Sequence, residues 1–335
     1  MKSKFIDYAR GFSILTIVAY HFLYEFKLPK FLAYAVSFGG AGVHLFIFSS
    51  GFGLAGSKYT TYTDFLFRRL KKVLIPYYIV ITLIFFINIF VNIYPAGFPE
   101  YLSHIFLYKM FVPKYAGSFG VQFWFVSTII QFYLVFPILL WAVNSKKYKA
   151  VFIICFLISI LYSTVVSFSP YSKLPIAERF FIQYLWEFIL GMIVNRAKLL
   201  DKLISQKLIY YVILFIINIT ITGLLAIKGG RIGQNFNDAF SFIAYTSIVI
   251  ILYRLGEHLK DPFSKFIFWI TGFSYTLYLI HMFIWDCIKV TNIYYAPFVL
   301  LLTLTCAFVF DKFVIKKITN LLDTNKTYTD LKAIP

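Results

Sequence analysis

Residues 72–94 read KVLIPYYIVITLIFFINIFVNIY and contain one charged side chain, Lys72, at their start. A helix needs about 20 consecutive apolar residues to cross the ~30 Å hydrocarbon core of a bilayer, and this stretch is long enough. The same length criterion gives ten candidate spans along the chain. They lie near residues 5–24, 40–56, 72–94, 121–143, 150–168, 179–196, 208–227, 237–254, 266–288 and 294–315. The sequence therefore predicts an all-α, polytopic integral membrane protein with about ten transmembrane helices.

The composition supports this class of protein. Apolar residues make up 60% and charged residues 14% of the 335 residues, and the mean hydropathy is +0.78. A soluble globular protein carries about 25% charged residues, so a soluble enzyme, a disordered protein and a disulfide-stapled secreted module are excluded. The three cysteines (Cys155, Cys287 and Cys306) are isolated in apolar stretches. Neither a disulfide framework nor a metal site is predicted.

The net charge of +18 follows the expected membrane topology rather than one soluble face. Of 32 Lys and Arg residues, 22 fall in the segments on the side of the N-terminus, 9 fall on the other side, and Arg10 lies inside the first predicted helix. This bias predicts that both termini are cytoplasmic, and nucleic acid is not an expected partner. Residues 1–317 are interpreted as a single transmembrane domain and residues 318–335 as a polar cytoplasmic tail. The loop at residues 95–120 is expected to include a short helix at the membrane interface.

The first predicted helix contains the densest group of ionisable residues. An ionisable group inside a span costs at least about 2.5–3.5 kcal/mol on insertion scales, so each one is a functional hypothesis. Arg10 and His21 are eleven positions apart, which is about 20° beyond three full turns, so they share one face about 16 Å apart along the axis. Considered alone, Arg10 could snorkel to the membrane interface and pair with Asp7, and His21 could form a hydrogen bond with a neighbouring helix. Their joint position favours a functional site.

A basic cluster precedes the third predicted span, in the sequence FLFRRLKKVLIPYY at residues 65–78. One interpretation is topological anchoring and attraction to anionic lipid. The other is a clamp for phosphate groups, for which Arg gives bidentate recognition. The residues concerned are Arg68, Arg69, Lys71 and Lys72.

Two further histidines, His44 and His281, fall at a depth comparable to that of His21. For His281 alone, a packed and hydrogen-bonded side chain is the preferred interpretation, whereas His44 is evenly balanced between structure and function. None of the histidines has the spacing of a metal site such as HExxH.

Five segments in this order resemble the membrane-bound acyltransferase 3 family. DYARGFSILTIVAYH (residues 7–21) contains an Arg and a His separated by ten residues, which is the hallmark of the family. The other four are GGAGVHLFIFSSGF (39–52), FLFRRLKKVLIPYY (65–78), FWFVSTIIQFYLVFP (123–137) and GFSYTLYLIH (272–281). The similarity covers residue 5 to about residue 285.

The resemblance implies transfer of an acyl group to a hydroxyl of an extracytoplasmic or lipid-linked glycan. The donor is usually acetyl-CoA, used as a substrate rather than as a bound cofactor, and succinyl or another short acyl group stays open. By the same resemblance His21 and Arg10 are expected to be catalytic, and Arg68, Arg69 and Lys72 to bind the donor. Substrate contacts are expected from His44, Ser50, Trp124 and His281, with His44 or Ser50 also considered for the oxyanion. A bacterial cytoplasmic membrane is the expected location.

Two departures from the family limit the residue roles and the acceptors that the resemblance implies. Thr128, Ile129 and Ile130 stand where many members carry a glutamate, so no carboxylate role is transferred there. No extracellular hydrolase-like domain is expected, which weakens peptidoglycan as the acceptor. A transporter or flippase of a glycan, lipid or small solute is the alternative function, and a catalytically silent member of an assembly complex is a third. The acceptor and the oligomeric state stay open, and a homo-oligomer is compatible with the sequence.

Overall fold

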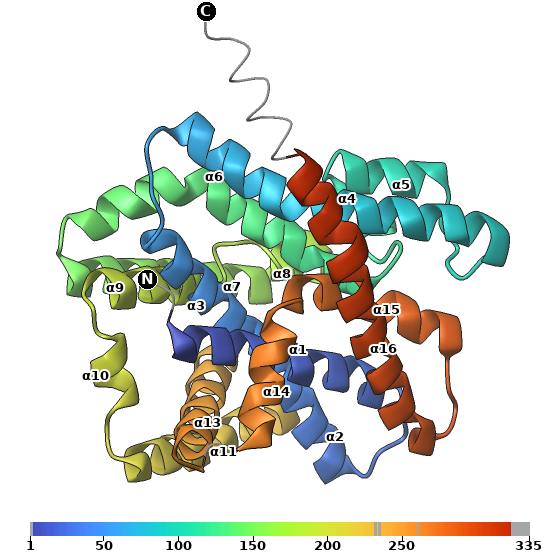
Figure 1. Ribbon diagram of the computed structural model, residues 1–335. Coiled ribbons are helices and arrows are strands. Elements are labelled where there is room, and N and C mark those ends of the chain that lie inside the picture. The colour runs from blue at the N-terminus through green and yellow to red at the C-terminus, as the bar shows by residue number, and fades with distance from the viewer. Residues whose placement is uncertain (1–2, 231–232, 234–235, 260, 323–335) are drawn as a thin grey trace, which may run out of the picture.

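The computed structural model describes residues 3–230, 233, 236–259 and 261–322, and within these residues every regular element is a helix or helical turn. The predicted all-α class is therefore confirmed. The helices gather around α1 (Lys4–Tyr24), which lies in the middle of the molecule and contacts α2, α3, α13, α14, α15 and α16 (Figure 1). The helices after α1 are α2 (Lys30–Phe38), α3 (Gly42–Ala55), α4 (Tyr62–Val91), α5 (Phe98–Ile105), α6 (Trp124–Asn144), α7 (Tyr148–Phe168), α8 (Pro175–Glu178), α9 (Leu185–Arg196), α10 (Leu200–Ile204), α11 (Leu208–Lys228), α13 (Asp238–Leu259), α14 (Pro262–Thr271), α15 (Ser274–Ile288) and α16 (Ala296–Phe310). Shorter turns are η1 (Gly39–Ala41), η2 (Lys109–Phe111), η3 (Pro113–Tyr115), η4 (Val121–Phe123), η5 (Pro170–Lys173), η6 (Ile293–Tyr295) and the π-helical turn η7 (Asp311–Ile315).

Seven helical segments among the described residues are long and apolar enough to cross a membrane, or eight if a bent pair counts as one span. The seven are Lys30–Ala55, Tyr62–Val91, Val121–Asn144, Tyr148–Phe168, Leu208–Lys228, Asp238–Leu259 and Ile293–Leu322. The multi-span membrane class is thus confirmed, whereas the number ten and the cytoplasmic position of the termini stay predictions. α1 is not among the seven because Asp7, Arg10 and His21 lower its mean hydropathy, and α9 is too short.

The span predicted over residues 266–288 is bent and consists of two helices. α14 ends at Thr271 and α15 begins at Ser274, and the two helices meet at 86°. The hydroxyl of Thr271 donates a hydrogen bond to the backbone carbonyl of Asp7 at 2.7 Å, which ties the end of α14 to α1. This tertiary contact holds the end of α14 against α1 at the position of the bend.

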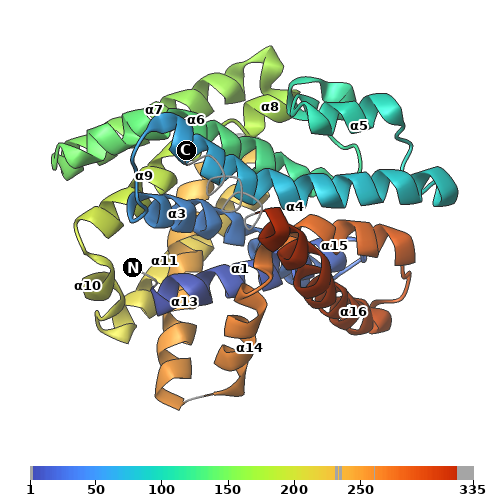
Figure 2. The same ribbon diagram turned by 45° about the horizontal axis from the view of Figure 1, so that its top comes forward.

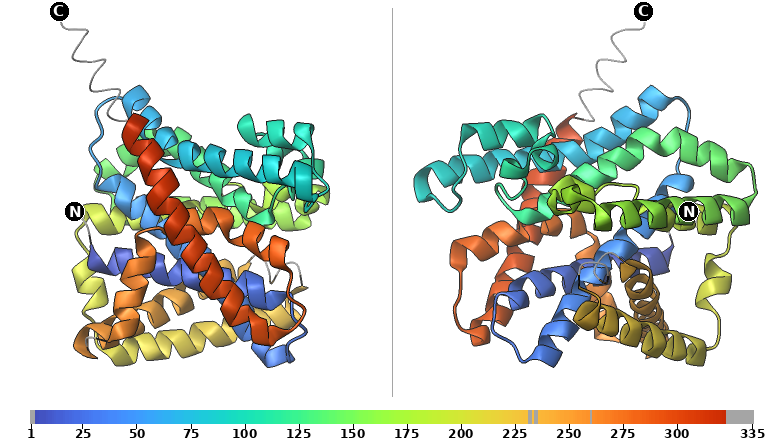
Figure 3. Two further views of the ribbon diagram at one scale, coloured as in Figure 1. Left: turned by 45° about the vertical axis from the view of Figure 1, so that its right-hand side comes forward. Right: turned by 180° about the vertical axis from the view of Figure 1, so that it is seen from behind.

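Several other boundaries also differ from those predicted. The Gly-rich second span is the end of a longer helical segment that starts at Lys30, and residues 179–184 before α9 are not helical. The loop after α4 contains the expected short helix, α5. The last helical segment continues to Leu322, past the predicted start of the tail at residue 318, and crosses the height of the molecule (Figure 3, left). Residues 323–335 of the tail lie outside the described residues.

α3 and α9 approach each other most closely at two glycines. A Cβ atom on Gly51 would collide with the backbone carbonyl oxygen of Phe188, and one on Gly191 would collide with that of Phe48. Small residues at such crossings allow backbones in a membrane to pack by van der Waals contact. This pair of helices therefore forms a rigid wall beside α1.

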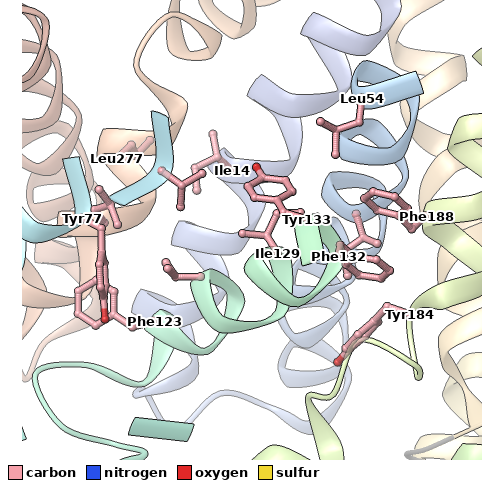
Figure 4. Close-up of a cluster of buried hydrophobic side chains, with 14 of the residues drawn as sticks. Ile14, Leu54, Tyr77, Phe123, Ile129, Phe132, Tyr133, Tyr184, Phe188 and Leu277 are labelled. Carbon is pink, nitrogen blue, oxygen red and sulfur yellow. The ribbon is translucent and has the colours of Figure 1, made fainter. Parts of the chain in front are cut away.

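Aromatic side chains fill the space between α1, α3, α4, α6 and α9. Phe132 of α6 stacks on Phe188 of α9 with ring centroids 4.2 Å apart, and Figure 4 shows the two rings side by side. Phe65 of α4 stacks on Phe136 of α6 at 4.4 Å. In Figure 2, α4, α6 and α7 lie along one face of the molecule and α13 and α14 lie on the opposite face, with α1 between them. The core thus holds α1 against helices from both halves of the chain.

Candidate active site

A cavity of about 450 Å³ lies among α1, α3, α4, α6 and α15. Arg10, Ile17 and His21 line it from α1, at intervals of seven and four residues that place them on one helix face. The expectation that Arg10 and His21 share a face is therefore confirmed. The other lining residues are Val43, Phe46, Ser50, Arg69, Lys72, Val73, Gln122, Trp124, Phe125, Ile129, Tyr133, Ser274, Tyr275 and Tyr278.

One end of this cavity is positively charged; we call it the basic end and define it by Arg10, Arg69 and Lys72. Arg69 and Lys72 also line a second cavity of about 470 Å³, so the two spaces adjoin. The second cavity is otherwise lined by Ser57, Lys58, Arg68, Lys71 and Thr319. The sequence cluster at residues 65–78 thus borders both cavities.

Arg68 is held differently from Arg69. Its Nη1 lies 2.5 Å from the Oδ2 of Asp64 one turn earlier, and its Nη2 donates to the backbone carbonyl of Lys58 at 3.2 Å. Arg69 instead lies over the ring of Phe65, 5.9 Å from its centroid, and faces the cavity. Arg69 and Lys72 therefore lie where the two cavities adjoin, whereas Arg68 lines only the second cavity.

The end of the cavity that contains His21, Gln122, Trp124 and Tyr278 is lined by aromatic and uncharged polar groups, together with His21; we call it the aromatic end. Tyr278 donates its hydroxyl proton to the backbone carbonyl of Gln122 at 2.6 Å, which joins α15 to the start of α6. His21 and Arg10 are eleven residues apart on one continuous helix, so about 16 Å separates the two ends.

The imidazole of His21 is bonded to the imidazole of His281. His21 Nδ1 lies 3.0 Å from His281 Nε2, and the rings are stacked with centroids 5.1 Å apart. His281 is fully buried, and its Nδ1 lies 2.8 Å from the carbonyl oxygen of Tyr278 and 3.2 Å from that of Leu277. His281 does not line the cavity itself, and it contacts the site through His21.

This arrangement assigns the protons of the pair. Because carbonyl oxygens only accept, His281 Nδ1 must carry the proton that it shares with Tyr278. In the neutral ring, Nε2 of His281 then accepts, so His21 Nδ1 must donate. His21 Nε2 is left as an unprotonated acceptor, and a ring held in this tautomer can take a proton from a hydroxyl group in the cavity.

In the loop between α4 and α6, the buried side chains of His104 and Lys109 hold the segment that leads to the aromatic end. His104 Nδ1 accepts from the hydroxyl of Tyr77 at 2.7 Å, because its Nε2 donates to Ser118, 3.1 Å from the carbonyl oxygen and 2.9 Å from the hydroxyl. Lys109 donates to the carbonyls of Ser118 and Gly120, each at 3.2 Å. Burial lowers the pKa of Lys109 to about 7 and, with the nearby Lys109 charge, lowers the pKa of His104 well below its usual value. These bonds hold residues 118–120, which lead directly into Gln122 and Trp124.

His44 does not line the cavity. Its Nδ1 lies 2.9 Å from Glu187 Oε1, and its Nε2 lies 3.6 Å from Asp238 Oδ1. Both ring nitrogens thus face carboxylates on α9 and α13, and nothing in this geometry supports the expected substrate or oxyanion contact. The ion pair that Arg10 could form with Asp7 is not present either, and Arg10 lines the cavity instead.

Sequence reasoning missed several lining residues. Tyr278 precedes His281 by three residues, so the helical period could have placed it near His281, and Tyr275 lies three residues before Tyr278. Tyr133 lies inside the quoted FWFVSTIIQFYLVFP segment, and Gln122 directly precedes it. Neither residue is charged, and an uncharged side chain in a span carries no signal of the kind that singled out Arg10 and His21.

The fold and the cavity define a polytopic helical membrane protein with a central cavity that is basic at one end. A family model described as an acyltransferase domain matches residues 3–312, so the chain belongs to the acyltransferase 3 family. The searches of curated proteins and of solved structures found no match. The protein is accordingly a multi-pass membrane acyltransferase.

Proposed function

We propose that the protein transfers an acyl group, acetyl in the first instance, from acyl-CoA to a hydroxyl of an extracytoplasmic or lipid-linked glycan, in a bacterial cytoplasmic membrane. The observation that carries the proposal is the single cavity that has Arg69, Lys72 and Arg10 at one end and His21 at the other. An anionic donor and an uncharged hydroxyl need such an arrangement, with cations on one side and a base on the other.

The basic end fits the phosphates of CoA. Arg69, Lys72 and Arg10 supply charges that can bind phosphate oxygens, and Arg68 adds a further one in the adjoining space. Ser274, the first residue of α15, also lines the cavity, and this helix has no side-chain cap at its N-terminus. The free backbone N–H groups and the helix dipole favour an anion there. The bent α14–α15 pair thereby contributes to the donor site.

The pantetheine arm of CoA is about as long as the ~16 Å rise between Arg10 and His21. With its nucleotide at the basic end, the donor would present its thioester carbonyl beside His21. His21 Nε2 then takes the proton of the acceptor hydroxyl while the oxygen attacks the carbonyl carbon. The tetrahedral intermediate collapses, the C–S bond breaks, and the imidazolium returns the proton to the thiolate. The products are an ester and free CoA.

The same nitrogen of His21 could first accept the acyl group covalently. The two routes differ in one measurable respect. A covalent route gives a burst of CoA release, equal in amount to the enzyme, when acetyl-CoA is added without acceptor. Direct transfer gives no burst.

The central test uses purified protein in proteoliposomes with acetyl-labelled acetyl-CoA and a glycan acceptor. His21→Ala is expected to lower transfer by about 10²- to 10⁴-fold, the usual contribution of a positioned acid–base group. His258→Ala is the matched control, because His258 is exposed at the end of α13 and lies outside the cavity. Full transfer by a well-folded His21→Ala protein would remove His21 from the mechanism.

A further inference from the structure

We propose that the natural acceptor is an acidic sugar, bearing a carboxylate or a phosphate, and that Arg179 binds its anionic group at the aromatic end of the cavity. This inference rests on the proposed function, since it names the class of acceptor for the same site.

Arg179 is held over the aromatic end by α6. Its guanidinium carbon lies 5.5 Å from the centroid of the Trp124 ring, and Trp124 lines the cavity. Its backbone carbonyl accepts a hydrogen bond from the hydroxyl of Thr128 at 2.7 Å. The position of the segment is therefore fixed from the same helix that presents Trp124, and the charge stands next to the cavity rather than in a free loop.

The guanidinium of Arg179 forms no ion pair with any residue that the structure describes. Its neighbour Glu178 is not paired with it, and the nearby carboxylates of Glu187 and Asp238 face His44 instead. Arg179 is close enough to Tyr20, Tyr184 and Tyr278 for its charge to interact with their hydroxyls. Arg179 does not itself line the cavity, and its guanidinium lies beside the aromatic end, next to Trp124.

The partly buried guanidinium of Arg179 has no counterion among the described residues, and its planar fork matches a carboxylate or a phosphate. This reasoning selects an anionic ligand over a neutral one.

Gln122 indicates that the same ligand carries hydroxyl groups. Its side chain is 2% exposed and lines the cavity, and its Oε1 is buried without a hydrogen-bond partner. Its Nε2 makes a long hydrogen bond, 3.4 Å, to the carbonyl of Leu279. An unpaired buried oxygen of this kind is destabilising, and a ligand hydroxyl can satisfy it. An anion at Arg179 and a hydroxyl at Gln122 together describe an acidic sugar.

The test compares three soluble acceptors at fixed acetyl-CoA: methyl glucuronide, glucose 6-phosphate and the neutral methyl glucoside. The wild-type protein is expected to show kcat/KM at least tenfold higher for one or both anionic acceptors than for the glucoside. Arg179→Gln is expected to abolish that ratio through a higher KM for the anionic acceptor. Lys114→Gln, which removes an exposed cation from the loop that also carries Lys109, should keep the ratio. The two anionic arms show whether a carboxylate or a phosphate is preferred.

Binding of the glucuronide and the phosphate to detergent-solubilised protein, measured by calorimetry, gives a readout that does not need turnover. Weaker binding to Arg179→Gln supports the proposal. It is overturned if wild type treats charged and neutral acceptors alike, if Arg179→Gln affects all three equally, or if phosphatidylglycerol displaces the sugars from Arg179. Transfer that depends on His21 but ignores acceptor charge would refute only this inference. Absence of any transfer that depends on His21 would refute the proposed function, and calorimetry would still decide the role of Arg179.

Discussion

His21 Nδ1 and His281 Nε2 are 3.0 Å apart, although 260 positions separate the two residues in the chain. Since the other nitrogen of His281 is bonded to backbone carbonyls, the contact fixes both the tautomer and the orientation of His21. We therefore propose that His281 positions the proposed base. His281 does not line the cavity, and nothing in this geometry supports its predicted direct contact with substrate.

His281→Ala should lower kcat by about 10- to 100-fold, which corresponds to the loss of one strong hydrogen bond, and should change the donor KM by less than about twofold. His281→Gln should recover part of the rate, because the amide oxygen can accept from His21 Nδ1. Steady-state kinetics in proteoliposomes measures both variants. Equal loss in the two variants, or a change confined to KM, would contradict the positioning role.

Arg69→Gln should raise the apparent KM for acetyl-CoA about tenfold or more, because Arg69 lines both cavities at the proposed phosphate site. The same variant should change the KM for S-acetylpantetheine, which lacks the nucleotide, by less than about twofold. Lys149→Gln is the matched control, since Lys149 is an exposed cation outside the two cavities. A similar rise for both donors would leave Arg69 a general structural residue.

The spacing of residues along one helix predicts one part of the candidate site. The other part depends on contacts between helices that are distant in the sequence. Arg10 and His21 lie on one helix, so their common face follows from their spacing. The hydrogen bond of His21 to His281 and that of His44 to Glu187 join distant helices, and no local pattern contains them. An ionisable residue in a span signals a site, but it does not show which partner it faces.

The fold divides in the same way. Apolar length located most of the helices, because each span must satisfy its own backbone hydrogen bonds. The bend between α14 and α15 escaped this reasoning, since Gly272 alone is tolerated inside a membrane helix and the bend depends on the bond from Thr271 to Asp7. Uncharged lining residues such as Gln122 were not predicted either, because only ionisable residues within a span were taken to indicate a site.

Lys109 should make the stability depend on pH. Its pKa is about 7 in the native protein, against 10.5 ordinarily, because it is buried. Between these values the unfolded chain holds a proton that the native protein lacks, so stability should rise with pH through this window by at most about 1.4 kcal/mol per unit. Thermal unfolding in detergent at pH 7, 8 and 9 measures the effect. Lys109→Met should flatten the dependence, and identical slopes in the two proteins would contradict the assignment.

His44→Ala should destabilise the protein without altering acceptor recognition. The substitution removes the imidazole between Glu187 and Asp238, and breaking a buried charged contact of this kind costs about 3–5 kcal/mol. Thermal unfolding should show a lower Tm, whereas KM for donor and acceptor should be unchanged in the folded fraction. His258→Ala serves again as the histidine control. A normal Tm with a raised acceptor KM would return His44 to the substrate site.

Gly51 and Gly53 on α3 make a matched pair for the packing of α3 against α9. A Cβ on Gly51 would collide with the backbone carbonyl of Phe188, whereas nothing lies within 4 Å of the corresponding position on Gly53. Gly51→Ala should therefore lower the Tm, by an amount equivalent to about 1–3 kcal/mol, because the two backbones must separate. Gly53→Ala should be neutral or slightly stabilising, since alanine favours the helix. Because α3 also carries Ser50 into the cavity, Gly51→Ala should lower transfer activity as well, and equal Tm values for the two variants would show that the crossing is not the rigid wall described here.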